Sequence, residues 1–263
     1  MNSMDKQINI QELLDWYIFA GVTETCADSF CLIDNNENSN LDLPQSVVRN
    51  KQTAVEKSVA PKQSVASKNA KDLCATATTL TELKEIMLKF EGCNLKNTAA
   101  STVFGKGNNN AQIMFIGEAP GADEDRLGAP FVGRCGKLLD KMFDAIKIKR
   151  EDCFITNVLP WRPPGNRAPT DEEIAICLPF LIRQIELIKP KYIVLLGGIA
   201  LKSVMETDDT ISRARGKWME YSISDDCKAN VVATYHPSYL LRSTSQKSKV
   251  WIDLLRLKNK FTE

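Results

Sequence analysis

Long apolar runs, net charge and histidine are all scarce in this sequence, and each scarcity narrows the functions open to it. The 263 residues contain no run of about 18 apolar residues and no secretory signal pattern, which predicts a cytoplasmic protein without a membrane segment. The formal net charge is +1, so a basic nucleic-acid-binding face would have to be local. His236 is the only histidine, so any role that needs an imidazole falls to it.

The composition is otherwise that of an ordinary globular protein. Apolar residues make up 43% and charged residues 25%, and the length suffices for one large α/β domain with an appendage. Eight cysteines are present. Because secretory features are missing, we expect them to be free thiols or metal ligands rather than disulfides.

Three segments of different composition follow one another along the chain. Apolar residues at helical spacing predict an amphipathic helix over 10–20, within an N-terminal appendage of residues 1–32. Residues 33–78 contain no aromatic side chain and cannot bury enough apolar area to offset their ordering entropy, so they are predicted to be a flexible linker. A folded domain is expected over 79–263, opening on a capping box. The sequence leaves open whether the N-terminal helix docks on this domain or recruits a partner.

Within this domain, short apolar segments alternate with helical ones. The strand candidates lie at 113–116, 153–158, 192–196 and 231–235. The helical stretches lie at 136–146, 170–188, 199–205 and 243–258. This repeated order of strand, helix and strand predicts an α/β fold with a parallel sheet that helices cover on both faces.

Polar side chains stand at the ends of these strands. Glu118 follows the first strand, Asn157 lies at the end of the second, and His236 follows the fourth. Each has an ordinary interpretation on its own, because asparagine commonly forms turns, a lone histidine commonly caps or packs, and a glutamate in a turn is commonly solvated. Since the carboxyl ends of parallel strands share one edge of the sheet, we expect all three to converge in one cleft.

These residue types suit the hydrolysis of an N-glycosidic bond. An asparagine amide offers one acceptor and two donors that match the edge of a pyrimidine, and Phe131 could stack on such a base. His236 could donate a hydrogen bond where negative charge builds on the departing base. Glu118 could orient or deprotonate a water.

Five motifs resemble those of the family 4 uracil-DNA glycosylases, the iron-sulfur type of a wider superfamily. They are GEAPGADED at 117–125, PFVGR at 130–134, ITN at 155–157, RPPGNR at 162–167 and HPSYLLR at 236–242. The resemblance covers roughly residues 80–258 and implies a three-layer α/β/α sandwich around a central four-stranded parallel sheet. It also implies a monomeric DNA-repair glycosylase whose catalytic domain, residues 79–263, flips uracil out of DNA and cleaves it off, leaving an abasic site.

The resemblance assigns roles to individual residues. Glu118 and His236 are expected to be catalytic, the first as the acidic residue and the second as the group that steadies the uracil anion. The substrate-binding positions, with Phe131 as the stacking ring and Asn157 as the uracil reader, are Gly117, Gly121, Phe131, Asn157 and Ser238. Other branches of the superfamily have a tyrosine at the position of Gly121 that excludes the thymine methyl, so discrimination is expected to be looser here.

A basic edge that contacts DNA is expected beside the strand ends. Four successive residues would form a loop that enters the minor groove and fills the gap left by the flipped base, and they are Tyr239, Leu240, Leu241 and Arg242. Arg162 and Arg167 would contact phosphates. Further basic residues expected along this edge are Arg213, Arg215, Lys217, Lys247 and Lys249.

The sequence departs from the family at its iron-sulfur site. The family holds a 4Fe-4S cluster on four cysteines, and only Cys93 and Cys177 match two of them, while Phe90 and Trp161 occupy the other positions. Two thiolates cannot hold a cluster that normally takes four, so we predict no cluster and no other metal, with both aromatic rings packed into the vacated volume. The remaining cysteines that could substitute, with poor ligand spacing, are Cys26, Cys31 and Cys74.

The sequence leaves three alternatives of other classes open. Residues 128–135 nearly spell a phosphate-binding loop but lack its Lys and Ser/Thr. Glu118 with Asp123–Asp125 could bind magnesium in a nuclease or phosphohydrolase, although an exposed turn is the simpler interpretation. A non-catalytic DNA-binding relative is the third. A glycosylase should keep its activity in a chelator, whereas a metal-dependent nuclease should lose it.

Overall fold

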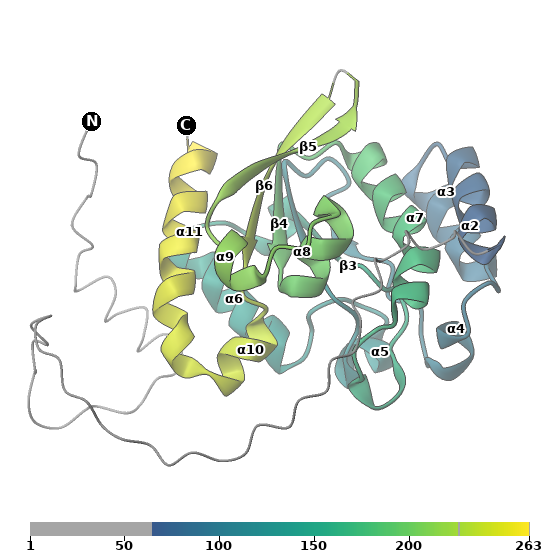
Figure 1. The fold of residues 1–263 in the computed structure, drawn as a ribbon, viewed down its shortest axis with the longest axis horizontal. Helices are drawn as coiled ribbons and strands as arrows, with labels where there is room; N and C mark the ends of the chain where they lie inside the picture. The colour runs from purple at the N-terminus through teal and green to yellow at the C-terminus, as the bar shows by residue number, and fades with distance from the viewer. Residues whose placement is uncertain (1–64, 226, 263) are drawn as a thin grey trace, which may run out of the picture. The chain divides into compact units, whose positions relative to one another are not determined.

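The structure is a computed structural model that describes residues 65–225 and 227–262 (Figure 1). The helix expected over 10–20, the appendage of residues 1–32 and most of the expected linker lie outside the described residues. The division of the chain before residue 65 therefore stays a prediction.

Six strands within the described residues form one sheet, in the order β1-β3-β2-β4-β6-β5. Their bounds are β1 Lys106–Gly107, β2 Ile113–Gly117, β3 Cys153–Asn157, β4 Tyr192–Leu196, β5 Trp218–Ser224 and β6 Cys227–Thr234. The four middle strands are parallel, and these are the four strands that the sequence predicted. The antiparallel edge strands β1 and β5 were missed, because β1 has only two residues and β5 alternates half-buried with exposed side chains.

Helices cover both faces of this sheet, which confirms the predicted three-layer α/β/α sandwich. One face carries α3 Leu80–Lys89, α7 Asp171–Ile188 and α8 Gly198–Met205, and the other carries α6 Arg134–Ile146 and α11 Lys247–Thr262 (Figure 1). Alternate residues of β2 serve the two cores, because successive side chains of a strand point to opposite faces. Met114 and Ile116 pack in the first core, and Ile113 and Phe115 pack in the second.

The shorter helical elements lie mostly in the connections. They are α4 Leu95–Thr98, α5 Ala122–Leu127, α9 Ile211–Ala214, α10 Pro237–Arg242 and the 3-10 turns Arg150–Asp152, Pro164–Asn166 and Thr244–Gln246. Among the described residues, none of the helices has the length and apolar character needed to cross a membrane.

The prediction of a flexible linker over 33–78 is wrong for its last part, because Val65–Thr76 form helix α2. This helix packs on α7 through fully buried Ala70, and the Ser67 hydroxyl donates a hydrogen bond of 2.8 Å to the carbonyl of Ala175. Composition misled here because the buried side chains are small, and small side chains let two helices approach closely without any aromatic residue. The folded domain therefore begins by residue 65, before the capped start of α3 at Thr79.

Candidate active site

The carboxyl ends of the parallel strands border a cavity of about 410 Å³. Gly117 at the end of β2 pairs with Asn157 at the end of β3, and His236 comes just after β6. The sequence-predicted site residues that line the cavity are Glu118, Gly121, Phe131, Asn157, Arg167, His236, Ser238 and Arg242. The structure thus brings together three polar side chains that are far apart in the chain.

Gly117 allows the close approach of two side chains that the site needs. A methyl group at this position would lie 2.4 Å from Oδ1 of Asn157 and 2.6 Å from Cζ of Phe131. Phe131 is buried, and its ring centroid lies 5.6 Å from that of His236. The aromatic ring, the amide and the imidazole therefore form one continuous wall because residue 117 has no side chain.

Asn157 presents an acceptor that no neighbour uses. Its side chain is buried, and Oδ1 accepts no hydrogen bond from any residue that the structure describes. A buried polar atom without a partner costs about 1–3 kcal/mol, so such an atom at a cavity wall indicates a ligand group that donates to it.

His236 is held in one tautomer by the start of helix α10. Its Nδ1 accepts a hydrogen bond of 3.1 Å from the backbone N–H of Ser238, so the neutral ring carries its proton on Nε2. Burial, together with the positive charge of Arg242, lowers the pKa of His236 to about 4. The imidazole is therefore neutral at pH 7, and Nε2–H is its remaining donor.

Glu118 and Arg242 each bring an ionisable group to the cavity wall. Burial raises the pKa of the Glu118 carboxyl above its ordinary value, and the nearby Arg242 guanidinium opposes that rise. Both residues line the cavity. A carboxylate with a raised pKa is a better proton acceptor, which is what a group that activates water needs.

The family model described as the uracil DNA glycosylase superfamily matches residues 104–255. Proteins named type-4 uracil-DNA glycosylase from several organisms are similar to this chain. The one from Archaeoglobus fulgidus is 47% identical over 163 residues, which are 60% of this chain and 81% of that protein. Those from Thermotoga maritima and Pyrobaculum aerophilum are 42% and 37% identical, covering 63% and 66% of this chain and 84% and 91% of the relatives. The chain belongs to the type-4 uracil-DNA glycosylases.

The acidic loop of this glycosylase is not the solvated turn that the sequence suggested. Glu124 is buried, and its Oε1 accepts hydrogen bonds of 2.9 Å from the N–H groups of Val132 and Gly133. Asp125 is also buried and accepts from two backbone N–H groups, at Ala100 and Ser101. Only Asp123 is exposed. These bonds assign the two buried carboxylates to loop structure, and the described residues include no group of three side chains suited to a metal ion.

The space beside Gly121 is occupied by Glu124. A methyl group on Gly121 would lie 2.7 Å from Oε2 of Glu124. The room that a glycine leaves at this position, which the sequence linked to looser discrimination, is therefore taken up by a carboxylate of the same loop.

The segment expected to be a DNA-facing loop is helix α10 (Figure 1). Pro237 and Leu240, three positions apart, share its inner face, and Leu240 is fully buried in the core. The expectation that Leu240 fills the gap in DNA is therefore wrong, because helical spacing turns it inward. Tyr239 and Leu241 are exposed, and Arg242 at the end of the helix borders the cavity.

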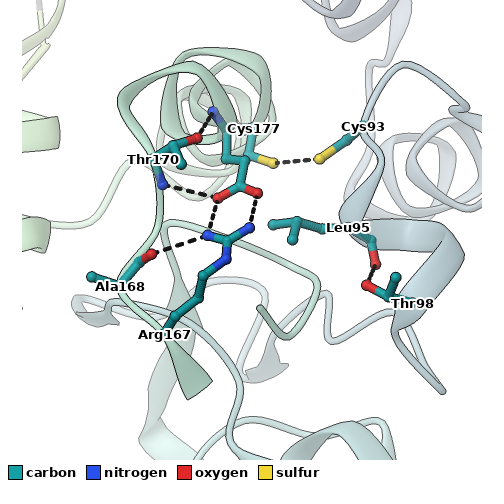
Figure 2. A network of polar contacts seen from close by, with 8 residues as sticks. Cys93, Leu95, Thr98, Arg167, Ala168, Thr170 and Cys177 are labelled. Atoms are coloured by element: carbon teal, nitrogen blue, oxygen red, sulfur yellow. Dashed lines mark hydrogen bonds and ion pairs between the residues drawn. The ribbon is translucent and has the colours of Figure 1, made fainter. Parts of the chain in front are cut away.

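Three of the expected DNA-contacting arginines are engaged within the protein. Nε of Arg162 donates a hydrogen bond of 2.8 Å to Oδ1 of Asn166. Arg167 directs Nη1 and Nη2 at the carboxylate of Glu173, at 2.8 and 2.5 Å, and Nη1 also donates to the Ala168 carbonyl at 3.0 Å (Figure 2). Arg215 forms a salt bridge of 2.8 Å with Asp253, which is nearly fully buried. The Arg167 contact fixes the loop at the rim of the cavity onto the start of α7, and the Arg215 contact lies against the core.

The four positions where the resemblance implies cluster ligands hold two thiols and two packed rings. The sulfur atoms of Cys93 and Cys177 lie 3.9 Å apart (Figure 2), and both residues are buried. The rings of Phe90 and Trp161 stack with centroids 6.4 Å apart and an interplanar angle of 15°. Indole Nε1–H of Trp161 donates to Thr102. This donor set does not fit a cluster that takes four thiolates.

Sequence reasoning missed several residues that shape the site. Glu124, Cys135 and Asn166 line the cavity, and Arg150 holds the backbone of Phe131 from outside it. The acidic run around Glu124 was noticed, but nothing in its sequence distinguishes a ligand for backbone amides from a solvated charge. For Arg150 the sequence carries no signal.

Proposed function

We propose that this protein hydrolyses the N-glycosidic bond of uracil in DNA and leaves an abasic site. The single observation that carries the proposal is the unpartnered Oδ1 of Asn157, buried at the wall of a cavity that also holds Phe131 and a neutral His236. Uracil fits such a set, because its N3–H donates to an amide oxygen and its O4 accepts from an amide nitrogen. The relatives that are 47% and 42% identical to this chain are named type-4 uracil-DNA glycosylases.

The reaction needs two opposite charges to be stabilised at once. As the bond from C1′ to N1 breaks, its electron pair moves onto the base, and negative charge builds at the base oxygens. Nε2–H of neutral His236 is the donor for that charge, and stacking on Phe131 holds the ring in place. Glu118 accepts the proton of the water whose oxygen attacks C1′, and its negative charge favours the cationic sugar.

A duplex substrate must first expose its base, since a base that is stacked and paired inside the duplex cannot enter the cavity. The exposed side chains of Tyr239 and Leu241 on α10, beside Arg242, are suited to occupy the space that the flipped base leaves and to contact phosphate. In this proposal Leu240 supports the helix from within, and the enzyme acts as a cytoplasmic monomer whose cavity is built from one chain.

The experiment that tests the proposal measures free uracil released from oligonucleotides with one deoxyuridine, single-stranded and duplex, with and without a chelator. We expect release of uracil and alkali-labile abasic sites in both conditions, and a loss of at least about 100-fold in Glu118→Gln. Strand breaks that appear without alkali and vanish with chelator would indicate the nuclease instead. Binding of the oligonucleotide without any release would indicate a non-catalytic relative.

We further propose that the protein works without a 4Fe-4S cluster. Protein purified under anaerobic conditions is expected to lack the broad absorption at about 400 nm that such clusters give, and to contain far less than one iron per chain. Uracil release by the Cys93→Ser, Cys177→Ser double variant should match that of the parent protein. Four irons per chain with the absorption band would overturn this part of the proposal and leave uracil excision standing.

A further inference from the structure

Phe131 has an unusual backbone conformation for a residue with a side chain. Its φ is +51°, in the left-handed region that glycine adopts readily and other residues rarely do. The ring of Phe131 belongs to the cavity wall, so the orientation of this one peptide decides where the ring lies. Something around it must hold the strained geometry.

Two charged side chains form hydrogen bonds with the peptide groups on either side of Phe131. Glu124 accepts from the N–H groups that follow it, at Val132 and Gly133. Arg150 donates from Nη2 to the carbonyls of Pro130 and Phe131, at 3.0 and 2.9 Å. The loop is therefore held by its N–H groups from one side chain and by its carbonyls from another.

Arg150 reaches this loop from a different part of the fold. It opens the 3-10 turn before β3 and does not line the cavity, and its side chain is half-buried. Nη1 is anchored 2.5 Å from Asp140 on helix α6. The same helix presents Gly136, where a methyl group would lie only 1.8 Å from the carbonyl oxygen of Phe131. That oxygen is thus confined between a helix backbone and the guanidinium.

We propose that Arg150 is a positioning residue of this enzyme, which sets the angle of the Phe131 ring over the base by holding the carbonyls of residues 130 and 131. The inference rests on the proposed function. Without the two bonds, the peptide of Phe131 relaxes to the ordinary negative φ and the ring leaves the cavity wall, although Arg150 itself contacts no substrate.

The test compares Arg150→Ala with Arg183→Ala, a closely matched control. Arg183 is also a half-buried arginine that donates two bonds to a backbone carbonyl, that of Ala77, and pairs with a carboxylate, that of Glu186. It lies on α7, away from the cavity. Three quantities are measured: hydrogen exchange at the amides of Val132 and Gly133, inhibition of excision by free uracil, and kcat/KM on a single-stranded substrate.

We expect Arg150→Ala to speed exchange at both amides at least tenfold, and to weaken uracil inhibition and kcat/KM about tenfold, while Arg183→Ala changes none of them. Arg150→Lys keeps the positive charge but lacks the planar guanidinium with its several N–H donors, so it should recover part of the loss. It replaces the alanine variant in the test if that variant does not fold. In a Phe131→Leu background, removing Arg150 should cost no further activity, because the ring it positions is already gone.

Two results would overturn the proposal: unchanged exchange and uracil inhibition in both Arg150 variants, or the same tenfold loss in the Phe131→Leu background. Hydrogen exchange at Val132 and Gly133 reports how firmly the loop around Phe131 is held, and it requires no catalysis. A parent protein that releases no uracil would therefore refute the proposed function, while the effect of Arg150 on the loop around Phe131 could still be tested.

Discussion

Replacing Gly117 with alanine is expected to lower kcat/KM for uracil excision by roughly 100-fold or more while the protein stays folded. The added methyl would meet Asn157 Oδ1 at 2.4 Å and the Phe131 ring at 2.6 Å, so both must move away from their present positions. Stacking and an amide read-out contact are each worth about 1–3 kcal/mol, and losing both accounts for a drop of this size. Gly117 lies in strand β2 and is not among the glycines with positive φ, so alanine brings no backbone strain.

Gly198→Ala is the matched control for this prediction. Gly198 also lies at a strand end, at the start of α8 after β4, and a methyl group there would meet nothing within 4 Å. Excision by this variant should equal that of the parent, and its melting temperature should be equal or slightly higher, since alanine favours a helix. Near-parent excision by Gly117→Ala would show that the wall formed by Asn157 and Phe131 is not where the base binds.

The central strands could be predicted because their sequences carry enough local information. β2 and β4 are uninterrupted apolar segments that stop at glycine, and both are buried on two faces, as a central parallel strand requires. Helix α2 carries no such signal, because its buried residues are alanine, serine and cysteine. The two-residue strand β1 exists only through its pairing with β3, so no local pattern could indicate it.

The candidate site also has one part that could be predicted from the sequence and another part that could not. Glu118, Asn157 and His236 could be expected to meet because strand order alone carries their backbones to one edge. The contacts of an arginine depend on side chains whose positions only the fold reveals. The sequence therefore suggested DNA phosphate as the partner of Arg167, but its guanidinium binds Glu173. Leu240 was misplaced for a geometric reason, because a helix turns inward a residue that a loop would have exposed.

His236→Asn is expected to reduce kcat for uracil by about 100- to 1000-fold, the usual cost of removing one donor to a developing oxyanion. Asparagine is chosen because His236 is the N-cap of α10, where its Nδ1 accepts from the N–H of Ser238. An asparagine oxygen can take over that cap, so the helix is kept while the donor at Nε2 is lost. Thermal unfolding, compared with that of the parent, verifies that only the donor has been removed.

The substrate itself can show whether His236 stabilises a departing anion. Fluorine at C5 makes uracil a better leaving group, so 5-fluorouracil needs less help, and the loss in His236→Asn should shrink several-fold for this base. Equal losses for both bases would place the role of His236 in binding instead.

The pH dependence separates a neutral donor from a charged one. With a pKa lowered to about 4 by burial and by Arg242, His236 stays neutral as the pH falls through 6.5, where an ordinary histidine gains its proton. The excision rate should therefore show no His236-dependent step between about pH 5.5 and 8. A rate in the parent that falls as the pH rises through about 6.5, and does not do so in His236→Asn, would instead mean that the active imidazole is protonated below that pH, and that it acts on the base as a cation or transfers that proton.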